Sequence, residues 1–167
     1  SIWVSTFHST CVRILRRFID HLGYDNAFTI YDSDDQKSLM KDICKQLNID
    51  TKKYKERTFL NAISSAKDEL KTPEQYADEV AKEYNKKIFG RVYKEYPKRL
   101  KQNNALDFDD LIMLTVQLFR QNAEILNHYQ ERFPFILVDE YQDTNTAQFT
   151  FCLLYTSPSP RDRGWSR

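Results

Sequence analysis

Two adjacent carboxylates, Asp139 and Glu140, directly follow an apolar run of four residues, 135–138. A continuous apolar run of this length is typical of a parallel strand that is buried on both faces. Such a strand would carry both carboxylates to the carboxyl edge of its sheet, where α/β proteins bind ligands. There, one carboxylate can hold Mg²⁺ and the other can accept a proton from an attacking water. The alternative is a pair of solvated turn residues.

A second stretch has the pattern that would place another strand in the same sheet. Residues 2–7 favour a strand, and either Ser9 or Thr10 can cap a helix after it. Gly23 is expected to end that helix. Apolar residues recur in the helix at the spacing of one face: Val12, Leu15, Ile19 and Leu22.

Between these two stretches, residues 25–104 are predicted to be almost entirely helical. Ser33 opens one helix, and Thr72 caps another at Pro73. A long helix is expected as far as Leu100, with breaks near Gly90 and at Pro97. The end of this stretch is basic and could follow a duplex backbone or form a solvated face: Lys82, Lys86, Lys87, Arg91, Lys94, Lys98, Arg99 and Lys101. A further helix is expected from Leu106.

Composition sets limits on the class of protein. The 167 residues carry 25 basic and 24 acidic side chains, so the net charge of +1 neither favours nor excludes a nucleic-acid partner. No apolar run reaches the length of a membrane helix, so no membrane partner is expected. The three cysteines have no metal-site spacing and are expected to be reduced, partly buried thiols. No GxxxxGK[ST] phosphate-binding loop occurs in the chain.

Three separated motifs occur in one order along the chain: Trp3 to Ser9 with Cys11 to Arg16, then Leu106 to Leu111, then Asp139 to Asn145 with Gln148. On these motifs residues 1–151 resemble superfamily 1A helicases of the UvrD/PcrA/Rep type, most closely the PcrA branch. The resemblance implies an α/β fold, mostly helical overall: a partial RecA-like P-loop NTPase domain with an inserted all-helical subdomain. The implied segments are 1–24 and 105–151 for the RecA-like domain (1A), and 25–104 for the helical insertion (1B-like). Residues 152–167 are expected to form a disordered, non-native tail, because residues 156–165 have two prolines and no hydrophobic period.

The resemblance also implies roles for individual residues. Asp139 is expected to be the Walker B ligand of Mg²⁺ and Glu140 the catalytic base. Gln142 is expected to couple the ATP site to its surroundings, or to be structural.

Three further residues match family positions that contact single-stranded DNA. Thr6 and His8 could hydrogen-bond phosphate oxygens, although His8 could instead pack beside its helix. Phe108 could stack on a base without reading its identity. The alternative is a core phenylalanine, which its neighbours Asp107 and Asp109 disfavour.

The implied function of the parent protein is an ATP-dependent 3′–5′ DNA helicase. Its cofactors would be ATP and Mg²⁺, and its partners single-stranded and duplex DNA with accessory repair or replication proteins. The expected setting is DNA repair or plasmid replication in a bacterial cytoplasm. Because the Walker A loop is expected ahead of residue 1, the fragment is expected to be inactive alone. The alternatives are the helicase domain of a RecB/AddA-type helicase–nuclease and a non-catalytic DNA-binding module; the insertion of about 80 residues favours the UvrD/PcrA type.

Overall fold

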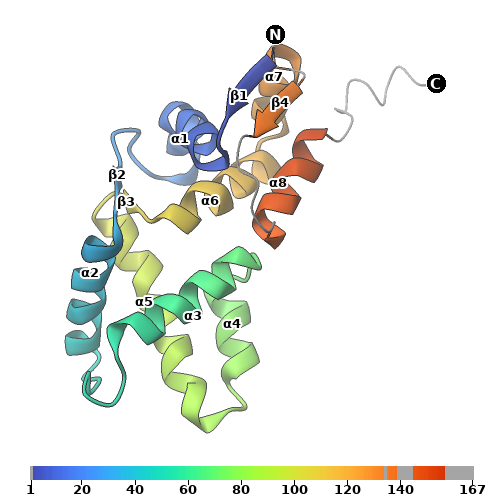
Figure 1. Cartoon of the computed structure of the whole chain (residues 1–167). Coiled ribbons are helices and arrows are strands. Elements are labelled where there is room, and N and C mark those ends of the chain that lie inside the picture. The colour runs from blue at the N-terminus through green and yellow to red at the C-terminus, as the bar shows by residue number, and fades with distance from the viewer. Residues whose placement is uncertain (1, 134, 139–144, 157–167) are drawn as a thin grey trace. The chain divides into compact units, whose positions relative to one another are not determined.

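The computed structural model describes residues 2–133, 135–138 and 145–156 (Figure 1). This part of the chain is mostly helical, with two small parallel sheets of two strands each. The mostly helical α/β character predicted from the sequence is therefore confirmed, while the RecA-like detail stays a prediction.

The chain divides into two compact units. The first, called the sheet unit below, comprises Ser1–Asn26 and Leu111–Arg167, and the second, called the helical unit, comprises Ala27–Asp110. The helical unit begins two residues later and ends six residues later than the expected insertion, 25–104. The assignment of these units to a RecA-like domain and its insertion remains a prediction.

The sheet unit is built around the parallel pair β1 (Ile2–Ser5) and β4 (Phe135–Val138), which lie side by side in Figure 1. The register pairs Ile2 with Phe135 and Ser5 with Val138. The parallel strand predicted from the apolar run 135–138 is thus present. Parallel strands need a long crossover connection, and here it contains the whole helical unit.

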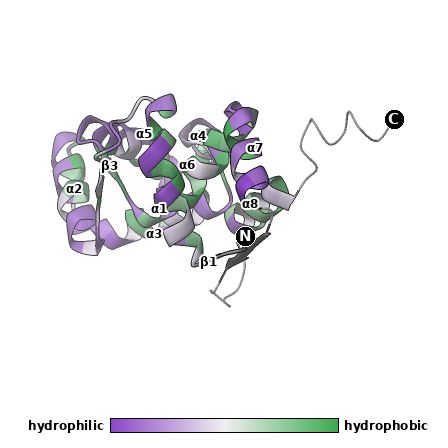
Figure 2. Ribbon diagram, turned by 90° about the horizontal axis from the view of Figure 1, so that it is seen from above, coloured by the Kyte–Doolittle hydropathy of each residue, from purple (hydrophilic) through white to green (hydrophobic). Residues whose placement is uncertain are grey.

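Helices complete the sheet unit: α1 (Phe7–Phe18), the short 3₁₀ helix η1 (Ile19–Leu22), most of α6 (Phe108–Gln121), α7 (Ala123–Arg132) and α8 (Thr146–Thr156). In α1 and α6 the apolar and polar residues separate by face, as the colours of Figure 2 show. Aromatic contacts join three helices in the core. The Phe151 ring stacks on Phe119 at 5.9 Å between centroids and meets Phe7 edge-on at 6.1 Å.

Helix α1 begins earlier than the sequence predicted. Strand β1 ends at Ser5 instead of Phe7, and the cap is Thr6 instead of Ser9 or Thr10. The reason is packing, because Phe7 is buried against α8 from the first turn of the helix. The predicted stop at Gly23 is confirmed. Gly23 adopts φ 84°, a left-handed conformation that glycine reaches without strain.

Helix α8 corrects the predicted start of the tail at residue 152. The helix continues to Thr156, and Tyr155 is buried in it. The Tyr155 hydroxyl donates to the backbone oxygens of Tyr129, at 2.8 Å, and of Phe133. These bonds connect the last turn of α8 to the end of α7. The composition of residues 152–156 does not reveal such contacts, which is why the start of the tail was misplaced. Residues 157–167 lie outside the described part of the chain.

The helical unit contains α2 (Ser33–Gln46), α3 (Glu56–Asp68), α4 (Pro73–Val80), the 3₁₀ turn η2 (Tyr84–Lys86) and α5 (Lys87–Gln102). The predicted openings of α2 and α4 are confirmed; Asp32 and Thr72 cap them in reciprocal capping boxes. The core is formed by buried side chains of α2, α3 and α5: Leu39, Met40, Ile43, Cys44, Phe59, Ile63, Ala66, Val92, Tyr93, Tyr96 and Leu100, together with Ala105.

A second parallel pair in the helical unit was not predicted. Strand β2 (Thr29–Ile30) pairs with β3 (Ala105–Leu106), where the sequence suggested that a helix begins at Leu106. Two-residue strands are too short to show alternation, so this pair leaves no pattern in the sequence.

The predicted helix breaks near Gly90 and at Pro97 are wrong. The chain leaves the helical path after Val80, and α5 then runs through both residues without interruption. Gly90 serves a different purpose, because a Cβ atom there would lie 3.2 Å from the Ala77 Cα. The absent side chain therefore lets α5 pack closely against α4. Hydroxyl bonds from Tyr93 and Tyr96 to residues outside α5 hold the turns around Pro97.

The cysteine prediction is confirmed for all three residues. Cys11 and Cys44 are buried, Cys152 is partly buried, and none forms a disulfide. Among the described residues, no cluster of three or more histidine, cysteine or acidic side chains is placed to hold a metal ion. The described helices are all too short or too polar to cross a membrane.

Candidate functional site

The parallel register of β1 and β4 defines one edge of the small sheet. Since Ser5 is paired with Val138, both strands end at the same edge. In parallel α/β sheets this carboxyl edge is where ligands bind. Asp139, Glu140 and Gln142 lie outside the described residues, so their predicted roles are untested.

The end of the motif that runs from Asp139 to Asn145, with Gln148, has a structural function. The Asn145 side chain accepts a hydrogen bond from the backbone N–H of Gln148 at 2.8 Å and so caps α8. Sequence reading had grouped Asn145 and Gln148 with the catalytic string. Both residues help to start the helix that follows the carboxylates.

Thr6 lies at the start of α1, directly after β1. Its hydroxyl oxygen accepts from the Ser9 backbone N–H at 3.1 Å and donates to the Ser9 hydroxyl at 2.8 Å. Because a phosphate oxygen only accepts, Thr6 would have to redirect its proton to bind DNA. Ser9 is exposed and carries a hydroxyl at the same helix start. From the sequence, Ser9 was expected only as a possible cap.

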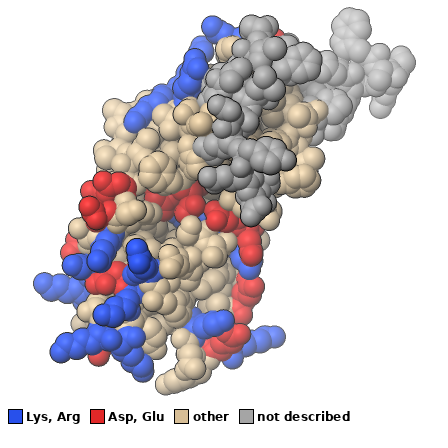
Figure 3. Space-filling model, in the orientation of Figure 1, with Lys and Arg blue, Asp and Glu red and all other residues tan. Residues whose placement is uncertain are grey.

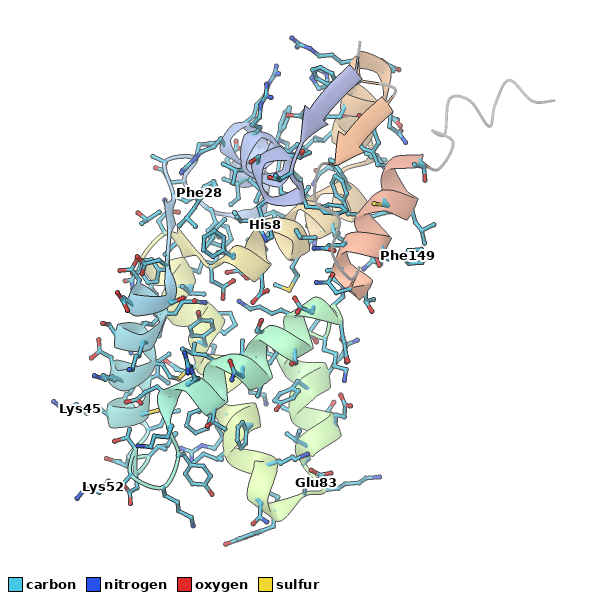
Figure 4. All side chains as sticks on the ribbon, in the orientation of Figure 1. His8, Phe28, Lys45, Lys52, Glu83 and Phe149 are labelled. Carbon is cyan, nitrogen blue, oxygen red and sulfur yellow. The ribbon has the colours of Figure 1, made fainter. Side chains whose placement is uncertain are left out.

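His8 belongs to the first turn of α1 and is half-buried (Figure 4). The turn that carries His8 is the amino end of the helix, where backbone N–H groups lack helical partners. The first turn of a helix is a common place for an anion to bind, although the Ser9 N–H already donates to the Thr6 hydroxyl oxygen here.

Phe108 is the first residue of α6 and is 52% exposed. Phe28, in the same unit, is 2% exposed and belongs to the core (Figure 4). The structure therefore does not bury Phe108 as a core residue. From the sequence, the acidic neighbours of Phe108 indicated an exposed position. That reason is wrong for Asp107, which is itself 1% exposed.

A cavity of about 660 Å³ opens beside Phe108 within the helical unit. A volume of this size is typical of small-ligand sites. Besides Phe108 and Asp109, its lining comes from α2, from α3 and from the residue before α3: Ser33, Asp34, Gln36, Lys37, Lys55, Glu56, Arg57, Leu60, Asn61 and Ser64. Three cations and three carboxylates line it, in keeping with the mixed charges of this unit in Figure 3.

The turn that carries Phe108 is fixed by a buried clamp. Asp107 and Asp110 cap each other. The backbone nitrogen of Asp107 donates to Oδ2 of Asp110 at 3.0 Å, and that of Asp110 donates to Oδ1 of Asp107 at 2.9 Å. Lys67 of α3 reaches one oxygen of each carboxylate at 2.8 Å. Tyr96 of α5 donates to Asp107 at 3.1 Å. Lys67, Asp107 and Asp110 are at most 5% exposed, so this clamp holds the start of α6 from inside the unit.

The charges of the clamp are strongly coupled. Burial alone would lower the pKa of Lys67, but Asp107 and Asp110 raise it well above its usual value. Burial opposes ionisation of Asp107, yet attraction and hydrogen bonding by Lys67 lower its pKa. Burial and the Asp107 charge raise the pKa of Asp110 to about 7, and the same two causes raise that of Asp109 to about 7. The single positive charge of Lys67 thus cannot neutralise the nearby carboxylates of Asp107, Asp109 and Asp110.

This excess of acid predicts a pH dependence of stability. Between pH 4 and 7 the folded state binds more protons at Asp109 and Asp110 than the unfolded state, whose pKa is near 3.8. Stability therefore falls as pH rises through this window. We expect the free energy of unfolding, measured by urea denaturation, to be higher at pH 5 than at pH 8. Asp109→Asn should reduce the difference, and an unchanged pH slope in that variant would contradict the assignment.

Comparison with known proteins adds a further finding. Residues 1–159 match the family model described as UvrD/REP helicase N-terminal domain. The chain is 53% identical over 156 residues to "ATP-dependent DNA helicase PcrA" of Staphylococcus aureus strain Mu50, covering 93% of the chain and 21% of that protein. It is 53% identical over 153 residues to the PcrA of Staphylococcus epidermidis strain RP62A, covering 92% of the chain and again 21% of that protein. The chain thus spans about a fifth of the length of these relatives.

Proposed function

Because the chain belongs to the UvrD/REP helicase N-terminal domain family, we propose that it is part of the motor of an ATP-dependent DNA helicase. The motor would move 3′ to 5′ along single-stranded DNA and separate duplex DNA. The observation that carries this proposal is the 53% identity to PcrA helicases over 93% of the chain. The parallel register of β1 and β4 supports it, since a nucleotide site needs such a carboxyl edge.

The proposed chemistry at that edge uses the carboxylates after β4. Asp139 would hold Mg²⁺ by its hard oxygen ligands, in part through water. When bound, the ion would neutralise charge on the phosphates of ATP. Glu140 would accept a proton from the water that attacks the γ-phosphate, and Gln142 would link this event to neighbouring elements. The apolar strand that ends at Val138 supports this arrangement, because it leads directly into both acids.

The proposed DNA contacts use two separate parts of the chain. At the start of α1, backbone N–H groups with Thr6, His8 and Ser9 would bind phosphate oxygens. In the helical unit, the exposed ring of Phe108 would stack on a base. Stacking tolerates every base, which suits a motor that must move along any sequence. We propose that such a motor serves cytoplasmic DNA repair or plasmid replication, with accessory proteins.

The proposal is tested with a chimeric helicase, in which residues 1–156 replace the matching segment of the Staphylococcus aureus PcrA. The measurements are ATP hydrolysis with and without single-stranded DNA, and unwinding of a duplex with a 3′ single-stranded tail. We expect DNA-stimulated hydrolysis and unwinding from the 3′ tail. A folded chimera that binds ATP but shows no stimulation by DNA would overturn the proposal.

The role of Phe108 predicts a defined loss of binding. In the chimeric helicase, Phe108→Ala should weaken binding of single-stranded DNA by about 1–3 kcal/mol, because one base loses its stacking partner. The measurement is fluorescence anisotropy with a labelled homopolymer. Tyr84→Ala is the matched control, since Tyr84 is an 88% exposed aromatic of the same unit that does not line the Phe108 cavity. Equal losses for both variants would exclude the stacking role.

A further inference from the structure

A second cavity, of about 170 Å³, lies within the sheet unit and has a strongly basic lining. The sheet unit contains no lysine, and arginine side chains colour its upper end blue in Figure 3. The cavity is lined by side chains of α1 and α7 and by the residue after α7: Arg13, Arg17, His128, Tyr129, Arg132 and Phe133. Three guanidinium groups and no carboxylate are among these lining residues. We call this cavity the arginine pocket.

The secondary structure explains how three arginines come together. Arg13 and Arg17 are four residues apart in α1, so they lie on the same side of the helix. Arg132 stands in the last turn of α7. The guanidinium of Arg17 lies 5.3 Å from the centre of the Phe18 ring, and that of Arg132 lies 5.7 Å from the centre of the Phe133 ring. Contact with aromatic faces holds planar guanidinium groups in defined positions.

The floor of the arginine pocket offers further polar groups. Tyr129 is 5% exposed, and burial raises the pKa of its phenol while Arg17, Arg13 and Arg132 lower it. The phenol is therefore within electrostatic reach of all three cations. His128 meets the Tyr129 ring edge-on at 5.2 Å. Its buried Nε2 atom has no hydrogen-bond partner among the described residues, which is unusual for a buried polar atom.

The arginine pocket is separate from the carboxyl edge proposed for the nucleotide. Arg17 belongs to the last turn of α1, roughly 15 Å along the helix from its start at a rise of 1.5 Å per residue. Phe133 comes before the first residue of β4, whereas the carboxylates follow its last. The pocket is thus at the amino end of β4.

We propose that the arginine pocket binds a phosphate group. Guanidinium groups offer paired N–H donors that match phosphate oxygens, and several of them together neutralise its charge. The Tyr129 hydroxyl and His128 Nε2–H would add two donors at the floor of the pocket. The group could belong to a nucleic-acid backbone or to a free phosphate ion, because both present the same oxygens. This inference does not depend on the proposed helicase activity.

The test uses the 167-residue chain and two probes, inorganic phosphate and a short single-stranded oligonucleotide without terminal phosphates. Nuclear magnetic resonance of the His128 imidazole reports binding locally, with sodium chloride at equal ionic strength as reference. Arg17→Ala and Arg132→Ala should each raise the dissociation constant about tenfold, which corresponds to ~1.4 kcal/mol. Arg120→Ala removes one exposed charge from the same unit outside the pocket, and it should change the constant less than twofold.

The two probes distinguish the source of the phosphate. Binding of the oligonucleotide alone, sensitive to Arg17→Ala, identifies a nucleic-acid backbone. If inorganic phosphate binds, with or without binding of the oligonucleotide, and Arg17→Ala weakens that binding, the pocket takes a free phosphate group. If neither probe shifts His128 more than chloride does, or if Arg120→Ala weakens binding as much as Arg17→Ala, the proposal is overturned.

Discussion

Replacing Lys67 by methionine is expected to destabilise the helical unit by about 3–5 kcal/mol, because it leaves Asp107 and Asp110 buried without their cation. Methionine keeps most of the length of the side chain, so lost volume contributes little. The loss would be large against the total stability of a typical domain, about 5–15 kcal/mol. Urea denaturation followed by circular dichroism measures it.

Lys71 provides a matched control for this experiment. It also pairs with two carboxylates, Glu69 at 2.7 Å and Glu79 at 3.0 Å, but at the surface. Exposed ion pairs contribute little because water already solvates both charges. Lys71→Met should therefore shift the unfolding midpoint far less than Lys67→Met. Equal shifts would show that burial of the clamp has no energetic consequence.

A triple variant separates the lost cation from the lost packing. Adding Asp107→Asn and Asp110→Asn to Lys67→Met removes the uncompensated charges while keeping side chains that can cap α6. We expect the triple variant to recover part of the stability lost in Lys67→Met. A triple variant less stable than Lys67→Met would indicate that the carboxylates contribute through contacts other than the Lys67 ion pairs. Phe108 follows Asp107 directly, so hydrogen exchange at the start of α6 would also report whether the clamp holds this turn.

The clamp shows where sequence reasoning stops. Lys67 is one of 25 basic residues in a chain whose charge is nearly balanced, and its neighbours in sequence do not distinguish it. Its partners are 40 and 43 residues away. The carboxylates at positions 107 and 110 both belong to the motif from Leu106 to Leu111, which the sequence does show. Their burial depends on α3 and α5, which only the folded unit brings together.

Elements with local signals were predictable. Strand β4 followed from four apolar residues, and α4 followed from Thr72 before Pro73, because each signal lies within the segment that it forms. The break in the long helical stretch was misplaced for the opposite reason. Gly90 and Pro97 weaken a helix locally, but packing against Ala77 and the bonds of Tyr93 and Tyr96 keep α5 continuous. Tertiary contacts decided the outcome there.

In the candidate site, too, local features could be predicted from the sequence and long-range contacts could not. The exposure of Phe108 agreed with the expectation of an accessible ring, although one of the neighbours used to argue it is buried. Thr6 was chosen as a phosphate contact, yet its hydroxyl is engaged in capping α1. This capping bond is local, and the sequence could have suggested it because threonine is a common residue at the start of a helix. The arginine pocket could not be foreseen, because it joins residues more than 100 positions apart.

Glu140→Gln in the chimeric helicase is expected to lower the rate of DNA-stimulated ATP hydrolysis about 10²–10⁴-fold. The amide keeps the shape of the carboxylate but cannot take the proton of the attacking water, and general-base catalysis contributes a factor of this size. ATP binding should change little, because the proposed contact with Mg²⁺ is made by Asp139. Glu124→Gln is the matched control, since it makes the same change at an exposed position of α7.

Asp139→Asn separates the roles of the two neighbouring acids. If Asp139 holds the metal, its amide variant should need more Mg²⁺, and raising the Mg²⁺ concentration should restore part of its activity. Glu140→Gln should not respond to Mg²⁺, since its defect would be in proton transfer. Full activity of Glu140→Gln would show that another group activates the water. Recovery of Glu140→Gln by Mg²⁺ would instead assign the metal to Glu140. Either result would change the role proposed for Glu140, while both acids would still directly follow β4 in the sequence.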